Sequence, residues 1–133
     1  MAKDGQPSPV SRILVVEDEL VVAMDMEMQL ISFGYEVTGI AATGEEAVRL
    51  TETTLPDLIL MDIQLRGAQD GLTTAAEIQR MRNLPIVFVT AFGNADARRR
   101  ANEASAYGFL TKPYRPEDLQ SVVSAAIQQH RSD

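Results

Sequence analysis

The sequence predicts an α/β fold in which a parallel β-sheet carries helices on both faces. Short apolar runs of strand length alternate five times with segments of helical periodicity, and this alternation is typical of parallel sheets built from right-handed crossovers. Three of the runs, at residues 13–16, 58–61 and 86–89, are apolar at every position. Continuous apolar strands of this kind are covered on both faces, so a doubly wound arrangement follows.

The first expected strand, 13–16, precedes a helix from Leu20 to about Gly34, where a glycine is a typical helix stop. This helix has two apolar stripes. The stripe expected to face the core comprises Leu20, Ala23, Met24, Met28 and Ile31. The stripe expected to face outward comprises Val22, Met26 and Phe33. Core packing or ordinary exposure explains the second stripe on one interpretation, and docking of a partner helix explains it on the other.

The second strand is expected over 35–41, where apolar and polar residues alternate, which indicates one poorer face and an edge position. A short helix over 45–53 closes before Pro56. The third strand, 57–62, ends in an acid. After a loop, the next helix starts at Asp70, a typical N-cap.

The second half continues the alternation. The strand 86–89 ends at Thr90, a helix of mixed polarity covers 94–106, a short mixed strand covers 107–111, and the last helix covers 115–130. Apolar strands belong in the middle of such a sheet and mixed strands at its edges. The order 2-1-3-4-5 of a flavodoxin-like (βα)5 three-layer sandwich satisfies this distribution.

The 133 residues fit one domain. We expect a flexible lead over 1–10, the domain over 11–130 and a tail over 131–133. The formal net charge of −7 argues against nucleic acid as the main partner. Cysteine is absent, the start has no secretion signal, and no run approaches the ~20 apolar residues of a membrane span. These features favour a soluble protein of the cytoplasm with no membrane partner.

Parallel strands share a carboxyl edge, so the residues that end neighbouring strands should meet: Glu17 and Asp18, then Asp62, Thr90 and Lys112. Three carboxylates repel one another unless a cation compensates them, and an oxygen-only set suits Mg²⁺. Mg²⁺ with a lysine neutralises a phosphoryl group in transfer. One carboxylate can then act as the nucleophile, with the threonine hydroxyl as a hydrogen-bond donor. The pattern therefore predicts phosphoryl transfer onto an aspartate.

These strand-end residues resemble the signature of response-regulator receiver domains of two-component signalling, and the matching positions are Glu17-Asp18, Asp62, Thr90 and the dipeptide Lys112-Pro113. The resemblance covers about residues 11–130. Its specific part is the spacing, 44 residues from Asp18 to Asp62, 28 from Asp62 to Thr90 and 22 from Thr90 to Lys112.

The resemblance implies that Asp62 accepts a phosphoryl group from the phosphohistidine of a sensor histidine kinase or phosphotransfer protein. It implies Mg²⁺ as the cofactor, and the implied ligands are Asp18 directly, Glu17 through water, Asp62 and the backbone carbonyl of Gln64. Lys112 would pair with the phosphoryl oxygens, and the Lys112-Pro113 bond is expected to be cis. The protein would be a phosphoacceptor regulator and not an enzyme, catalysing only its own phosphorylation and dephosphorylation.

The resemblance also implies a conformational switch, in which Thr90 moves toward the phosphate and Phe109 moves inward. The changed surface would lie over 94–130, where a downstream protein target or a second copy of the chain would bind. Kinase docking would fall on the helix after the first strand, at Glu19, Val22 and Met26.

Some residues depart from the family pattern. Glu17 stands where a second aspartate is commoner, and the loop after Asp62 is one residue longer, with Arg66-Gly67 replacing the usual Met-Pro. The run Arg98-Arg99-Arg100 is expected to be a solvated helix face, or a contact for an acidic protein partner. Only about three residues follow the last helix, so the chain is expected to be a stand-alone receiver or one excised from a longer protein.

Two other functions remain open. A small Mg²⁺-dependent phosphohydrolase of the haloacid-dehalogenase type also uses a strand-end aspartate, but it needs an acid two residues later, where Gln64 stands. A receiver-like module could instead bind partners without phosphorylation. The complete set of acids, threonine and lysine argues against that module, because mutually repelling carboxylates have no purely structural use.

Overall fold

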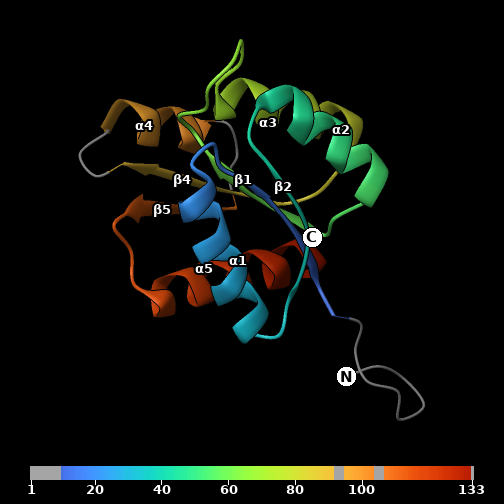
Figure 1. The fold of residues 1–133 in the computed structure, drawn as a ribbon, viewed down its shortest axis with the longest axis vertical. Helices are drawn as coiled ribbons and strands as arrows, with labels where there is room; N and C mark the ends of the chain where they lie inside the picture. Colours follow the sequence, from blue (N-terminus) through green and yellow to red (C-terminus); the bar gives the residue numbers. More distant parts are fainter. Residues whose placement is uncertain (1–9, 92–94, 104–106, 133) are drawn as a thin grey trace.

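The computed structural model describes residues 10–91, 95–103 and 107–132, so nearly all of the expected N-terminal lead lies outside it. The described chain forms one parallel sheet with the strand order β2-β1-β3-β4-β5 (Figure 1). The strands are β1 (Arg12–Val16), β2 (Glu36–Ala41), β3 (Leu58–Asp62), β4 (Ile86–Ala91) and β5 (Gly108–Lys112). The flavodoxin-like order and fold class predicted from the sequence are confirmed.

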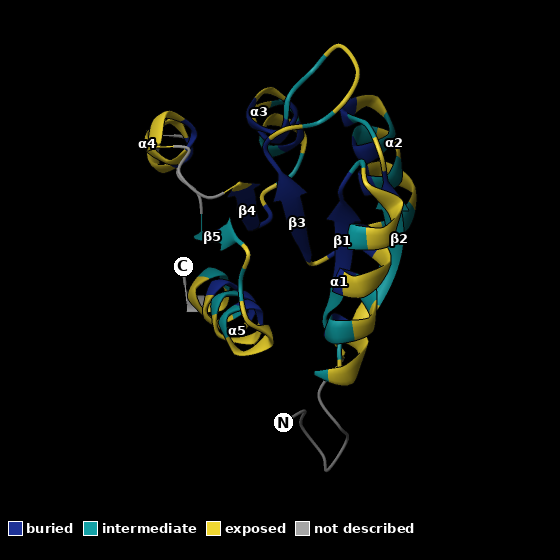
Figure 2. Cartoon of the chain, turned by 60° about the vertical axis from the view of Figure 1, so that its left-hand side comes forward, coloured by how far each residue is buried: buried dark blue, intermediate teal, exposed yellow. Residues whose placement is uncertain are grey.

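The helices form a layer on each side of the sheet (Figure 2). They are α1 (Leu20–Ser32), α2 (Gly44–Thr54), α3 (Gly71–Met81), α4 (Ala95–Glu103) and α5 (Pro116–Ser132). Apolar residues of α2, α3 and α4 pack on one face of the sheet, and those of α1 and α5 pack on the other. Because β1, β3 and β4 contribute buried side chains to both clusters, their sequences are apolar without alternation.

Local signals set the helix ends. Asp70 caps α3 by accepting a hydrogen bond from the Thr73 amide at 2.8 Å. Gly34, with a φ of +96°, lies in the left-handed region just after α1. The last helix, α5, ends at Ser132, two residues beyond its expected end and inside the segment expected to be a tail. None of the described helices is both long enough and apolar enough to cross a bilayer.

Apart from Ala23, which is buried as expected, the two faces of α1 were assigned wrongly from the sequence. Met26 is only 2% exposed and packs in the core with Ala23 and Leu30, while Val22 and Phe33 are half-buried against the same cluster. The face that is exposed to solvent comprises Leu20, Val21, Met24, Met28 and Ile31. We call these five residues the exposed α1 face. Apolar residues occupy both sides of this helix, so the 3.6-residue period did not select the buried side.

Candidate functional site

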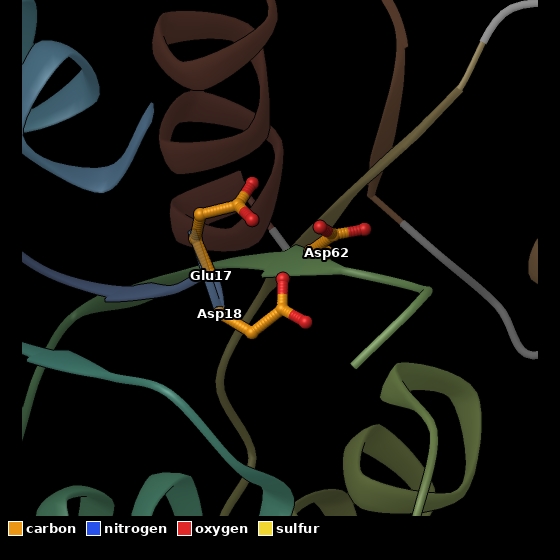
Figure 3. A group of neighbouring side chains, drawn as sticks. All are labelled: Glu17, Asp18 and Asp62. Carbon is orange, nitrogen blue, oxygen red and sulfur yellow. The ribbon is translucent and has the colours of Figure 1, made fainter. Parts of the chain in front are cut away.

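Three carboxylates meet at the carboxyl edge of the sheet. Glu17 and Asp18 directly follow β1, and Asp62 is the last residue of β3, the neighbouring strand. One carboxylate oxygen from each residue lies within 4.8 Å of the other two (Figure 3). Glu17 is 1% exposed and Asp62 is 5% exposed. The structure thus brings together the acids that the strand order was expected to gather.

Lys112, the last residue of the edge strand β5, also contacts this acid cluster. Its Nζ lies 2.7 Å from Oε1 of Glu17 and 3.3 Å from Oδ2 of Asp62. Burial acts to lower the pKa of Lys112, but the hydrogen bond to Glu17 and the charges of Asp62 and Glu17 outweigh it and raise that pKa. The lysine is therefore held in its charged form beside Asp62.

Even with this lysine, the charged form of the Glu17 carboxylate is incompletely stabilised. Burial raises the pKa of Glu17 to about 7, and the hydrogen bond from Lys112 only partly opposes that rise. The donor set consists of carboxylate oxygens, which a hard divalent cation such as Mg²⁺ prefers. The residues present therefore fit the magnesium ion that the sequence implies.

Thr90 lies at the same edge with an unused hydroxyl. It follows Val89, which is paired in register with Asp62 and accepts a hydrogen bond from the Ile63 amide at 2.9 Å. Thr90 is 1% exposed, and its Oγ1 has no hydrogen-bond partner among the described residues. A buried hydroxyl without a partner is costly, so this atom is available for an acceptor that enters the site.

The loop after β3 fixes the backbone around Asp62. The Gln64 amide donates a hydrogen bond to Oδ1 of Asp62 at 3.0 Å, whereas a metal contact of the Gln64 carbonyl stays a prediction. Gly71, the first residue of α3, donates from its amide to the Ile63 carbonyl at 2.7 Å. A β-carbon on Gly71 would lie 2.1 Å from the Asp62 carbonyl oxygen. Close approach of α3 to the end of β3 therefore requires glycine here.

Sequence reasoning did not give Gly71 or Arg66 a role at the site. The Arg66 Nε lies 3.4 Å from Oδ2 of Asp18. The signal for Arg66 was the departure from Met-Pro in this loop, but the reach of a long side chain cannot be deduced from spacing. The signal for Gly71 was its place directly after Asp70, which was interpreted only as the N-cap of a helix.

Of the remaining predicted positions, Pro113 and Glu19 lie at the carboxyl edge, whereas Phe109 lies three residues before Lys112 in β5. The Lys112-Pro113 peptide bond is cis. Phe109 is half-buried in β5, and the guanidinium of Arg98 lies 5.1 Å from the centre of its ring. Glu19 is exposed beside the acids, and its amide donates to Oε2 of Glu17 at 3.1 Å. Val22 and Met26, the expected docking residues, are not part of the exposed surface near these acids, because they pack against the core on the buried side of α1.

Comparison with known proteins gives consistent matches. The response regulator receiver domain family matches residues 13–124. The transcriptional regulatory protein PdtaR of Mycobacterium tuberculosis is 38% identical over 96% of this chain and 62% of its own length. The phyllosphere-induced regulator PhyR of Methylorubrum extorquens is 35% identical over 88% of this chain and 43% of its own length. The chain thus spans less than two thirds of either regulator.

Solved structures agree with this assignment. The signal receiver domain of a modulated diguanylate cyclase from Desulfovibrio desulfuricans G20 superimposes with a TM-score of 0.85 at 37% identity, covering 92% of this chain and 98% of that one. The anti-anti-sigma factor PhyR of Bartonella quintana gives a TM-score of 0.80 at 30% identity, covering 94% of this chain and 51% of that one. With its fold and strand-end residues, this chain belongs to the response regulator receiver domain family.

Proposed function

We propose that this chain is a phosphoacceptor switch of a two-component phosphorelay. Asp62 would receive a phosphoryl group from the phosphohistidine of a sensor histidine kinase or a phosphotransfer protein. The observation that carries the proposal is the position of the Asp62 carboxylate, which lies within 4.8 Å of the two acids that follow β1 and 3.3 Å from the ammonium of Lys112. A nucleophilic carboxylate flanked by a metal-binding set and a fixed cation matches the needs of phosphoryl transfer.

In this reaction a carboxylate oxygen of Asp62 forms a bond to phosphorus. The phosphorus–nitrogen bond of the phosphohistidine breaks, and its electron pair remains on the imidazole nitrogen. The product is an acyl phosphate, whose added negative charge Lys112 is placed to pair. The unpartnered hydroxyl of Thr90 would donate a hydrogen bond to a phosphoryl oxygen.

Mg²⁺ would be held by Asp18, Asp62, the carbonyl of Gln64 and, through water, Glu17, and when bound it neutralises the charge that builds up on the transferring group. The chain itself supplies the rest of the site. Asp62 would provide the nucleophile and Lys112 the fixed positive charge. The carboxylates of Glu17 and Asp62 are buried, so most solvent is excluded from them.

Acetyl phosphate tests this proposal without a kinase. With Mg²⁺ we expect the protein to gain the mass of one phosphoryl group, measured on the intact chain. Excess chelator should prevent the gain, because the transferring group then loses its metal counter-charge. A protein that binds Mg²⁺ but never becomes labelled would instead be a receiver-like interaction module. Continuous phosphate release without a labelled intermediate would favour the phosphohydrolase.

The exposed α1 face is the surface that we assign to kinase docking, in place of Val22 and Met26. It begins at Leu20, two residues after Asp18, so it adjoins the acid cluster. A donor must bring its phosphohistidine to Asp62, and this adjoining surface is apolar, with Met28 69% exposed. A helix of the kinase with a complementary apolar stripe is the partner that fits it.

Met28→Glu should therefore slow phosphoryl transfer from the cognate kinase by about tenfold or more, since a charge would be buried at the centre of the contact. Labelling by acetyl phosphate should stay unchanged. Met81→Glu is the matched control, because Met81 is also exposed but lies on α3, on the opposite side of the sheet. Equal transfer rates for Met28→Glu and the wild type, measured with the fastest-transferring kinase of the source organism, would remove this assignment.

The output surface would be formed by α4, β5 and α5, the described part of the 94–130 face. Phe109 in β5 would turn inward as Thr90 engages the phosphate, and the cation–π contact from Arg98 would be broken or moved. A downstream protein target, or a second copy of the chain, would recognise the altered surface. This role is supported by the position of Phe109 on the strand that also carries Lys112.

A further inference from the structure

Arg66 is a second cation at the acid cluster, separate from Lys112. Its Nε lies 3.4 Å from Oδ2 of Asp18, while Lys112 contacts Glu17 and Asp62. Among the ion pairs between described residues, Asp18 pairs with Arg66 alone. In this structure each carboxylate of the cluster therefore faces a positive side chain, and the one that faces Asp18 belongs to the loop between β3 and α3.

The backbone of this loop is anchored close to the site. Arg66 forms an isolated parallel bridge with Thr43, the N-cap residue of α2. The next residue, Gly67, has a φ of +101°, a conformation that favours glycine, and it lies near the side chain of Thr43. The backbone of Arg66 is thus held beside the start of α2, and from there its side chain reaches Asp18.

The backbone of Arg66 is anchored, but its side chain can move away from Asp18. It is 78% exposed, whereas the side chain of Asp18 is only 13% exposed. An ion pair with one solvated partner is weak and easily exchanged. The backbone of Arg66 is anchored while its guanidinium is exposed to solvent. This arrangement is expected of a counter-ion that a more strongly bound cation displaces.

We propose that Arg66 is the resident counter-ion of Asp18, which Mg²⁺ must displace, so that Arg66 sets the Mg²⁺ concentration at which the site loads. The inference rests on the proposed function, since it concerns the same acid cluster. The guanidinium and the metal compete for one carboxylate, and the energy of an exposed ion pair corresponds to a change of about two- to fivefold in metal affinity.

Calorimetric titration with Mg²⁺ alone tests the inference on the intact chain. Arg66→Gln should bind Mg²⁺ about threefold more tightly than the wild type, and this gain should shrink at high salt. Arg49→Gln is the charge-matched control, because Arg49 is also exposed but pairs with Glu46 on α2. That control removes the same charge without touching Asp18, so its Mg²⁺ affinity should stay close to that of the wild type.

Labelling by acetyl phosphate supplies a second readout. Arg66→Gln should be labelled faster than the wild type when Mg²⁺ is limiting and at the same rate when Mg²⁺ is saturating, which is the signature of competition for the metal. An affinity equal to that of Arg49→Gln, or weaker than that of the wild type, would overturn the counter-ion role and leave the proposed function intact. Absence of Mg²⁺ binding and labelling in the wild type would overturn both.

Discussion

Replacing Asp62 by asparagine is expected to abolish labelling by acetyl phosphate with Mg²⁺. The amide has no nucleophilic carboxylate oxygen, so no acyl phosphate can form. The change also removes one of three crowded negative charges, and the contact of Lys112 with Glu17 remains available. We therefore expect the variant to fold and to be at least as stable as the wild type, as measured by thermal unfolding.

Asp57→Asn is the matched control for this experiment. Asp57 immediately precedes β3, at the end opposite Asp62, and its Oδ2 accepts a hydrogen bond from the Arg12 amide at 2.8 Å. An asparagine can still accept that bond, so labelling of this variant should match the wild type. Persistent aspartyl phosphate in Asp62→Asn would show that another carboxylate is the acceptor.

Gly71→Ala is expected to destabilise the fold by about 3 kcal/mol or more, because overpacking against backbone has no easy relief. The three atoms nearest the new β-carbon are all backbone atoms, the closest being the Asp62 carbonyl oxygen at 2.1 Å. Helix α3 would have to move away from β3 and would strain the 2.7 Å hydrogen bond from Gly71 to Ile63. Urea unfolding followed by far-UV circular dichroism gives the difference in free energy of unfolding.

Gly39→Ala separates this effect from the general cost of replacing a glycine. Gly39 lies in β2, where a β-carbon would meet only side-chain methyl groups, Leu50 Cδ1 at 3.6 Å and Leu14 Cδ1 at 3.9 Å. These are ordinary van der Waals distances, so the change in stability should be within about 1 kcal/mol. Equal stabilities for Gly71→Ala and Gly39→Ala would contradict the tight packing of α3 on β3.

The position of the site could be predicted from the sequence because it depends on topology. All-apolar runs identified the central strands, and parallel strands place their last residues at one edge. Glu17, Asp62 and Lys112 meet there although 95 residues separate the first from the last. No knowledge of side-chain conformation was needed to bring these residues together.

Other features could not be predicted because they depend on packing. On α1, Met26 and Met28 are equally apolar, and only the seating of the helix on the sheet decides that the first is buried and the second is exposed. The lack of a partner for Thr90 Oγ1 requires knowledge of every neighbouring atom. The tight fit at Gly71 likewise depends on how closely α3 approaches β3.

The contact between Lys112 and Glu17 joins the last residue of β5 to the residue that follows β1, and β3 and β4 lie between these strands in the sheet. This ion pair links two strands that are not neighbours in the sheet, and its ammonium also contacts Asp62. A phosphoryl group added to Asp62 would attract the Lys112 ammonium and weaken its contact with Glu17. The stiffness of this end of the sheet would then vary with the chemical state of one aspartate.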